Sequence, residues 1–279
     1  MTSHAERFGR IVSGADNEIN LAEAALLIAA EEYRALEIPR YLTKLDEMAA
    51  TLKRRLRADI SQADTIIAMN RYLFEELGFA GDAANYYDAR NSFLNEVIDR
   101  KRGIPITLAM IYIEIARRIG LPVQGVAFPA HFLVKCPLRD GTVVLDPYAK
   151  GASLSFEELR RRVKALRNGA EPTKSMVAGM LITASNREIL ARLLRNLKGI
   201  YSHHKDWMKA LSATDRIISV MPALAEEYRD RGMIYLNLEC FRAALFDFQA
   251  YLKMLPVARD AETVREKVAE LQTLASRLN

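Results

Sequence analysis

Two side chains of the sequence have the types needed for acid–base chemistry and lie in segments that could bring them together. His131 stands between the apolar triplets FPA and FLV, and Asp146 ends the apolar run TVVLD, just before Pro147. A carboxylate at the end of a neighbouring strand can accept a hydrogen bond from an imidazole, and such a pair can act as a general base. We therefore predict that His131 contacts Asp146. The structural alternative is an ordinary hydrogen-bonded histidine in a strand.

The elements that must position this pair follow a definite order along the chain. Gly103 and Pro105 precede a long apolar run, ITLAMIYIEIARRIG, which predicts a buried helix ending at Gly120. Three short segments with strand character follow, PVQGVAFP, HFLVKC and TVVLDP. This order resembles that of transglutaminase-like, papain-like thiol enzymes, in which a cysteine at a helix N-terminus is followed by a histidine and then by an aspartate.

The resemblance implies where the nucleophile of such an enzyme would stand. A helix N-terminus carries partial positive charge, which lowers the pKa of a thiol, and the histidine then takes the proton. When the ending ARRIGLP is aligned, the Gly-x-Cys of the superfamily falls on Gly103, Ile104 and Pro105. Proline has no ionisable group. The resemblance therefore implies that the usual acyl-enzyme does not form at Pro105.

Two other residues could replace the missing thiol. Thr107 lies two positions farther into the helix, but that step rotates the side chain by about 200°, and a threonine near a helix start is typically a capping or first-turn residue. Cys136 follows His131 by an odd number of positions on what should be one strand, which places the two side chains on opposite faces. Thr107 therefore remains a candidate nucleophile. Cys136 is the poorer candidate and is predicted to be a buried thiol.

The residues before this region predict further helices. Apolar residues recur at three- and four-residue spacing over residues 16–58, with a break at Pro39, which predicts two antiparallel helices. A third helix is predicted over residues 61–77, ending at Gly78. The polar stretch GFAGDAANYYDARN should be a loop, and Asn91 at its end is the expected N-cap of the next helix, SFLNEVIDRK.

The last third of the sequence contains an internal repeat. Residues 193–222 align without a gap with residues 227–256, at an offset of 34 residues. Small residues at Ala210 and Ala244 would let paired helices approach closely, and each copy ends in a proline. The pattern resembles the tetratricopeptide repeat.

The repeat pattern makes three structural predictions. Trp207 and Phe241, which occupy the same place in the two copies, should wedge between the paired helices. A last helix over residues 259–278 should cap the array. Because two repeats and a cap are few for a freestanding array, we also expect the array to dock onto the N-terminal domain.

The predicted fold class is therefore α+β and mostly helical. A transglutaminase-like domain with N-terminal helices and a short antiparallel sheet should cover residues 1–185, closed by the helix SFEELRRRVKALR. An all-α region of two tetratricopeptide-like repeats and a capping helix should cover residues 186–279.

Composition narrows the class of protein. The chain has 279 residues, of which 50% are hydrophobic, so it can bury a sizeable core. Its net charge is +5, but the basic runs KRRLR and RRRVKALR have helical periodicity and are expected to be solvated faces, so no nucleic-acid partner is expected. No apolar run approaches the roughly 20 residues of a membrane span, and the N-terminus lacks a signal-peptide pattern. We expect a cytoplasmic protein that does not bind membranes.

The two cysteines, Cys136 and Cys240, have neither a disulfide pattern nor a metal-ligand spacing, and each is predicted to be a buried thiol. No metal and no cofactor are expected.

Particular phrases sharpen the resemblance. GIPITLA and PAHFLVK, with NSFLNEVIDRK, VVLDPYAKG and the two repeats, resemble the bacterial SirB-type family of transglutaminase-like proteins over roughly residues 15–258. A similar domain occurs in an F-box protein of animals. The resemblance implies a two-part architecture and a missing catalytic thiol, with no established substrate. His131 and Asp146 would then be a remnant dyad, and Pro105 would mark the lost nucleophile.

Two functions fit these features. The first is a non-catalytic interaction or regulatory protein, whose cleft and repeats bind a protein or peptide. Arg195, Asn196, Lys198 and Arg229 are the candidate partner-binding residues, although they could equally form a solvated face. The second is an acyl-transfer or amide-hydrolysing enzyme that uses Thr107, or a water activated by His131. The missing thiol favours the first.

Overall fold

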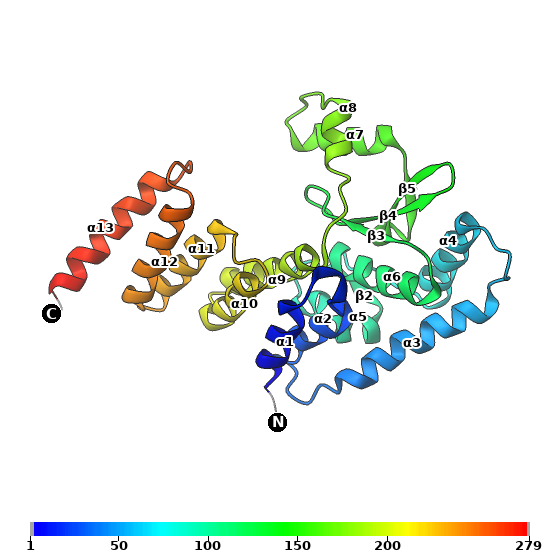
Figure 1. Cartoon of the computed structure of the whole chain (residues 1–279), viewed down its shortest axis with the longest axis horizontal. Coiled ribbons are helices and arrows are strands. Elements are labelled where there is room, and N and C mark those ends of the chain that lie inside the picture. Colours follow the sequence, from blue (N-terminus) through cyan, green and yellow to red (C-terminus); the bar gives the residue numbers. More distant parts are fainter. Residues whose placement is uncertain (1–2, 278–279) are drawn as a thin grey trace. The chain divides into compact units, whose positions relative to one another are not determined.

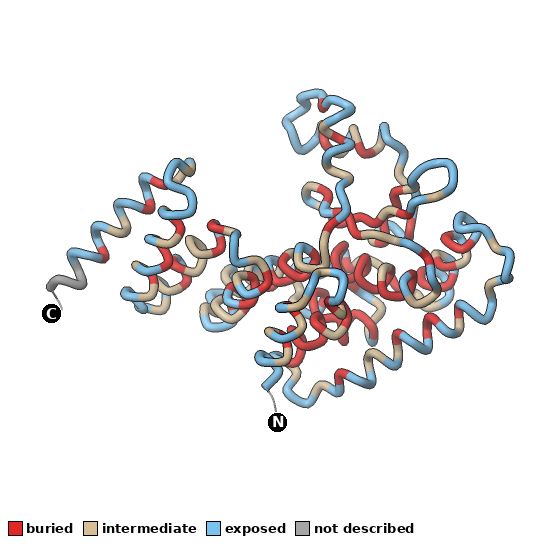
Figure 2. The backbone as a smooth tube through the Cα atoms, viewed as in Figure 1, coloured by how far each residue is buried: buried red, intermediate tan, exposed pale blue. Residues whose placement is uncertain are grey.

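The long apolar helix is α6 (Pro105–Ile119), which is buried along most of its length (Figures 1 and 2). The computed structural model describes residues 3–277, with side chains for residues 3–273, and the chain divides into two units, residues 1–189 and 190–279. Gly120 ends α6 with a φ of 85°, a left-handed conformation that glycine adopts without strain. The helix forms the core of the first unit, as predicted.

Helices from the N-terminal part of the chain surround α6. The helices α2, α3 and α5 contact it directly. The pair predicted over residues 16–58 is present as α2 and α3, but a 3₁₀ turn, η1 (Asp16–Glu18), precedes α2 and shortens it. The pattern did not predict α1, because only Phe8 and Val12 of that helix are buried. The bounds of these helices are α1 (His4–Ser13), α2 (Leu21–Ala29), α3 (Ile38–Arg55) and α5 (Leu94–Arg100).

The helix predicted over residues 61–77 is present but changes type. It begins as α4 (Gln62–Asn70) and continues as a π-helix, η2 (Arg71–Glu76). Gly78 follows with a φ of 75°. Apolar spacing does not distinguish a short π segment from an α-helix, so this change was not predicted. Such segments are often found at functional sites.

The sheet is antiparallel, with four strands in the order β3-β4-β5-β6. The three predicted strands are β3 (Gln124–Val126), β4 (Leu133–Leu138) and β5 (Gly141–Asp146). The fourth, β6 (Ala152–Leu154), was not predicted, since it is short and carries few apolar residues. A 3₁₀ turn, η4 (Pro147–Ala149), joins β5 to β6.

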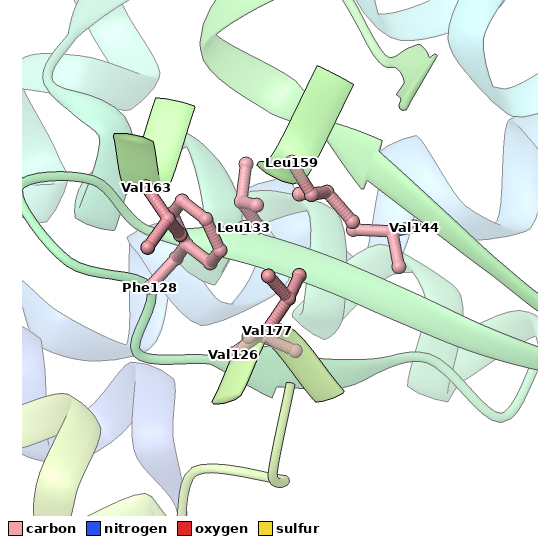
Figure 3. Close-up of a cluster of buried hydrophobic side chains, with 7 residues drawn as sticks. All are labelled: Val126, Phe128, Leu133, Val144, Leu159, Val163 and Val177. Atoms are coloured by element: carbon pink, nitrogen blue, oxygen red, sulfur yellow. The ribbon is translucent and has the colours of Figure 1, made fainter. Parts of the chain in front are cut away.

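Helices cover both faces of this sheet. On one face, side chains of β3, β4 and β5 pack against α7 (Phe156–Leu166) and α8 (Lys174–Gly179), and Figure 3 shows this apolar cluster. On the other face lies α6, which contacts β3 and β4. Because side chains alternate along a strand, Leu133 faces α7 and α8 while Val134 and Cys136 face α6.

The predicted loop over residues 78–91 has some regular structure. Its first residues form β1 (Ala80–Gly81), which pairs in parallel with β2 (Arg102–Gly103) just before α6. Its last residues begin a 3₁₀ turn, η3 (Ala89–Ser92). This pairing ties the loop to the start of α6.

The second unit consists of helices, as predicted. Ala210 and Ala244 are fully buried, and Pro222 and Pro256 follow the ends of the second helix of each repeat. The bounds are α9 (Asn186–His203), which begins in the first unit, α10 (Trp207–Val220), α11 (Ala225–Asn237), α12 (Phe241–Met254) and α13 (Ala261–Arg277). The tetratricopeptide-like architecture is confirmed.

The aromatic wedge of the repeats differs from the prediction. Phe241 is 37% exposed and Trp207 is only half-buried, so neither fills the space between paired helices. Phe248 does so in the second repeat: it is fully buried, and a Cβ added at Gly232 would lie 2.6 Å from its ring. Both predicted residues begin their helices, where the neighbouring helix covers less of their surface.

Among the residues that the structure describes, no helix is both long and apolar enough to cross a membrane. The docking of the repeat array onto the N-terminal domain stays a prediction.

Candidate functional site

The structure brings His131 and Asp146 together. Nε2 of His131 lies 2.8 Å from Oδ1 of Asp146. The aspartate ends β5, as expected, but the histidine does not open a strand. It lies in the turn before β4, because Ala130 adopts a φ of 55° and the strand begins only at Leu133. The histidine side chain is 20% exposed and the aspartate side chain 3%.

Asp146 is held as a carboxylate by several donors. Its Oδ1 also accepts the backbone N–H groups of Tyr148 and Ala149, at 3.1 and 3.3 Å, and its Oδ2 accepts a bond from Arg162 at 3.0 Å. Burial alone would raise the pKa of Asp146, but the hydrogen bonds and charges of His131 and Arg162 outweigh burial and hold this pKa below its usual value. Sequence reasoning did not identify Arg162 as a partner of Asp146, because it did not show that α7 packs beside the end of β5.

A carboxylate at Nε2 determines which tautomer His131 adopts. The neutral imidazole places its proton on Nε2 and donates it to Asp146, which leaves Nδ1 with a lone pair. Within residues 3–273 this second nitrogen has no hydrogen-bond partner. Chemically, the pair therefore presents one acceptor atom that could bind a donor or take a proton.

Tyr148 supports the pair from the side. Its ring stands edge-on to the imidazole, with centroids 5.9 Å apart and an interplanar angle of 87°. The ring lies directly against Gly81 of β1, where an added Cβ would come within 2.4 Å of the Cε2 atom of Tyr148. Any other residue at Gly81 would displace the ring. Sequence reasoning did not identify this need for a glycine at position 81.

The turn after Asp146 is fixed by Asn70, the last residue of α4. Its Nδ2 donates to the carbonyl of Gly151 at 2.9 Å, and its Oδ1 accepts from the hydroxyl of Tyr112, in α6, at 2.8 Å. Gly151 has a φ of 74°, and a Cβ there would lie 2.2 Å from Oδ1 of Asn70. Helices α4 and α6 thus hold the segment that carries the aspartate.

The start of α6 has a different character. Pro105 occupies its first turn and is buried. Thr107 is fully buried, and its hydroxyl accepts the N–H of Ile104 at 3.1 Å and lies 2.8 Å from the carbonyl of Asn91, to which it donates. A hydroxyl engaged in this way caps the helix. The hydroxyl of Thr107 is therefore poorly suited to act as a nucleophile, a role that the sequence had left possible.

Asn91 is not the N-cap of α5, contrary to our expectation. That cap is Phe93, with no side-chain hydrogen bond. Asn91 is fully buried instead, and its Nδ2 donates to Oδ2 of Asp82 at 3.2 Å and to the carbonyl of Asn85 at 2.7 Å. Its Oδ1 accepts from Arg100 at 3.2 Å. The prediction was wrong because the polar partners of Asn91 lie in the preceding loop and at the end of α5.

Asp82, the first of these partners, is also buried. Burial raises the pKa of Asp82, but hydrogen bonds from the backbone and side chain of Asn85 and from Asn91 lower this pKa by more. The pKa of Asp82 therefore lies below its usual value. Since Thr107 donates to the backbone of Asn91, this polar cluster links the NSFLN and GIPITLA phrases.

Cys136 is fully buried in β4, and burial raises the pKa of its thiol. A thiol with a raised pKa is a weak nucleophile at neutral pH. The argument from strand alternation does not apply, since His131 lies outside β4. Because Cys136 is buried, it remains a poor candidate for the nucleophile. The prediction that Cys240 is buried was wrong, since this residue is exposed just before α12.

The predicted partner-binding cations contact acidic side chains of the second unit. Arg195 pairs with Glu227 at 2.6 Å, and Lys198 pairs with Glu227 at 2.7 Å and with Asp230 at 2.6 Å. Glu227 is only 3% exposed, so these ion pairs belong to the packing of α9 against α11.

The two remaining candidates of this set lie in the same helices. Arg229 pairs with Asp230 at 2.8 Å and with Asp260 at 2.6 Å. Asn196 is half-buried on α9. In the described part of the chain, no group of three His, Cys, Asp or Glu side chains could hold a metal ion.

Comparison with known proteins adds the family. A sequence profile of the transglutaminase-like superfamily matches residues 39–195, which is more than half of the chain. The chain belongs to the transglutaminase-like superfamily. A tetratricopeptide-repeat profile matches residues 197–269, so the transglutaminase-like domain is followed by repeats of that type.

Two bacterial relatives match this chain over most of their length, and an animal relative matches over a quarter of its length. A UPF0162 protein of Xylella fastidiosa is 40% identical over 260 residues, covering 92% of this chain and 91% of the relative. Protein SirB1 of Salmonella typhimurium is 25% identical over 265 residues, covering 94% and 96%. F-box only protein 21 of Homo sapiens is 31% identical over 158 residues, which are 50% of this chain and 25% of that protein.

Proposed function

We infer that this transglutaminase-like protein is a non-catalytic interaction or regulatory protein that binds a protein segment in the cytoplasm. The observation that carries this proposal is the start of α6, where buried Pro105 stands at the position that the family resemblance gives to the thiol. The nearest hydroxyl in the helix, that of Thr107, is buried and used for capping. No ionisable nucleophile is therefore supplied by the first turn of this helix.

The site of binding follows from what is retained. The His131–Asp146 pair keeps a defined tautomer and an acceptor nitrogen, which suits recognition of a hydrogen-bond donor. Tetratricopeptide repeats typically form extended binding surfaces, which supports a protein partner. Because Arg195, Lys198 and Arg229 are ion-paired internally, we do not propose them as the main contacts. The unpaired thiols of Cys136 and Cys240 agree with a reducing compartment.

One observation favours a second candidate function. Nδ1 of His131 could take a proton from a water molecule, with Asp146 stabilising the resulting imidazolium. The protein would then hydrolyse esters or amides without a covalent intermediate. We rank this candidate second, because Pro105 lacks an N–H and the hydroxyl of Thr107 is already engaged, so neither supplies a donor for a developing oxyanion.

Two assays on the purified full-length chain separate these functions. The first measures hydrolysis of an activated ester and incorporation of a fluorescent amine into a glutamine-rich protein. We expect the same background for the unaltered chain and for His131→Ala. Turnover that disappears in His131→Ala would favour the enzyme instead.

The second assay measures protein capture from a bacterial lysate, with the full chain, His131→Ala and residues 1–185 as baits. Circular dichroism would verify that each bait is folded. A prey that the full chain retains, and that one of the two changes removes, supports an interaction protein and shows which unit binds. If no prey depends on either change, the proposal fails.

A further inference from the structure

Four aromatic rings form a continuous series that begins at the dyad. The imidazole of His131 contacts Tyr148, Tyr148 contacts Tyr86 with centroids 6.4 Å apart, and Tyr86 contacts Tyr87 at 5.3 Å. Each ring is nearly perpendicular to the next, with interplanar angles of 87°, 74° and 78°. We call these four residues the aromatic ladder.

The ladder leads from a half-buried end to a solvent-exposed end. The His131 side chain is 20% exposed, whereas Tyr86 is 38% and Tyr87 78% exposed. Large aromatic side chains are normally buried, so two adjacent exposed tyrosines on one loop indicate a binding surface. The support of Tyr148 by Gly81 fixes the inner half of the ladder.

Two arginines beside the ladder are ion-paired. Arg90 pairs with Asp88 at 2.6 Å, and Arg162 pairs with Asp146 at 3.0 Å and with Glu158 at 3.4 Å. Neither arginine therefore offers an unpaired guanidinium to a phosphate or to an acidic tail. The ladder offers aromatic surface and, at its inner end, the lone pair on Nδ1 of His131.

We propose that the aromatic ladder binds an uncharged, proline-rich segment of a partner protein in an extended conformation. The inference rests on the proposed function, because it names the kind of partner that the remnant site takes. Perpendicular rings present edges and faces side by side, against which the compact, rigid ring of proline can pack. A polyproline II segment makes no internal hydrogen bonds, so a backbone N–H of a non-proline residue is free to donate to Nδ1 of His131.

The chemistry of the ladder favours this ligand over two others. A phosphorylated or acidic segment requires unpaired arginines, and those beside the ladder are paired. A flexible segment without prolines would lose more conformational entropy on binding, whereas polyproline II is largely preformed.

The test measures binding of a defined probe to the full-length chain. The probe is a blocked, uncharged peptide of about nine residues with the repeat Pro-Pro-Ala, which spans three turns of polyproline II. The matched control peptide has the repeat Gly-Gly-Ala. Calorimetric titration gives the affinity, and amide NMR spectra of the labelled chain identify the residues that respond.

Three variants connect binding to the ladder. Tyr87→Ala removes its most exposed ring and should weaken binding by about tenfold, since such a contact contributes about 1.4 kcal/mol. His131→Gln should also weaken binding. Phe246→Ala removes an aromatic side chain of similar exposure, 69%, in the second unit and should change nothing. Unchanged amide spectra outside residues 81–90 would show that Tyr87→Ala is folded.

We expect the proline peptide to bind, the glycine peptide not to bind, and amide shifts to centre on residues 81–90, 131 and 148. Equal binding of both peptides, equal affinity of Tyr87→Ala and the unaltered chain, or no binding of the proline peptide would each overturn the inference. Shifts confined to residues 190–279 would overturn it too. In all these cases, a prey still captured through the first unit would leave the proposed function standing.

Discussion

The two regions of the proposed remnant site, the start of α6 and the turn around His131, differ in the groups that they contain. At the start of α6, a buried proline and a capping threonine leave no ionisable group. At the turn around His131, the carboxylate of Asp146 receives four hydrogen-bonding contacts, and Gly81 makes room for Tyr148. The first region therefore contains no side chain that could attack a substrate. The second holds a hydrogen-bonded histidine–carboxylate pair.

This difference bears on function because the region around His131 is costly to maintain. A carboxylate that is 3% exposed loses its hydration and requires several donors to compensate. A histidine needed only for packing would not require that arrangement. The contrast therefore supports a remaining use for His131 that does not involve a covalent intermediate, which is the basis of the proposed binding function.

The largest effect is expected from Asn91→Ala, which removes support from the start of α6. The change leaves Asp82 and Arg100 without their shared partner in a buried cluster, so the free energy of unfolding should fall by about 3 kcal/mol. Urea denaturation followed by circular dichroism would measure this. Asn85→Ala is the matched control, because its side chain is exposed and its amide lies 3.4 Å from Asp82. Equal losses for both variants would show that Asn91 does not organise the cluster.

A smaller effect is expected from Gly81→Ala, which disturbs the turn around His131. The new Cβ would overlap the ring of Tyr148, and such overpacking costs about 1 to 3 kcal/mol. Gly9→Ala provides the comparison: Gly9 lies in α1 with no atom within 4 Å of an added Cβ, so that change should stabilise the helix slightly. The histidine NMR signals should shift in Gly81→Ala alone. Unshifted histidine signals would mean that Tyr148 does not position His131.

The smallest effect is expected in the pH dependence of the free energy of unfolding. Since the folded pKa of Asp146 lies below its unfolded value of about 3.9, this residue stabilises the fold above that pH. The contribution is lost as the pH falls through the folded pKa. The difference in unfolding free energy between the unaltered chain and Asp146→Asn should therefore shrink as the pH falls from about 5 to about 3. A difference that stays constant or grows would show that Asp146 is not held as a carboxylate.

Sequence reasoning predicted features that depend on local periodicity or on chain order. The buried helix α6, the strands around the dyad and the paired helices of the repeats all follow from apolar spacing and turn residues. The contact between His131 and Asp146 follows from their places at the ends of neighbouring strand segments.

Features that depend on distant partners were missed or misjudged. Asn91 was assigned a local capping role, whereas its contacts come from Asp82 and Arg100. Lys198 was a candidate for partner binding, with a solvated face as the alternative, and the acids that pair with it lie on α11, a separate helix. A single sequence shows which residue types are present, but not which of them meet in three dimensions.

Our central claim is that His131 faces the start of α6 at position 105. It rests on Tyr148, which contacts both the imidazole and Gly81, the strand partner of Gly103. Pro105→Cys tests this claim most directly, in a chain that also carries Cys240→Ser. The thiolate absorbance of the introduced cysteine would be titrated against pH, with and without His131→Ala. We expect a thiol pKa below about 7 that returns towards the ordinary value of about 8.5 when His131 is removed. An ordinary or raised pKa that does not depend on His131 would contradict the claim.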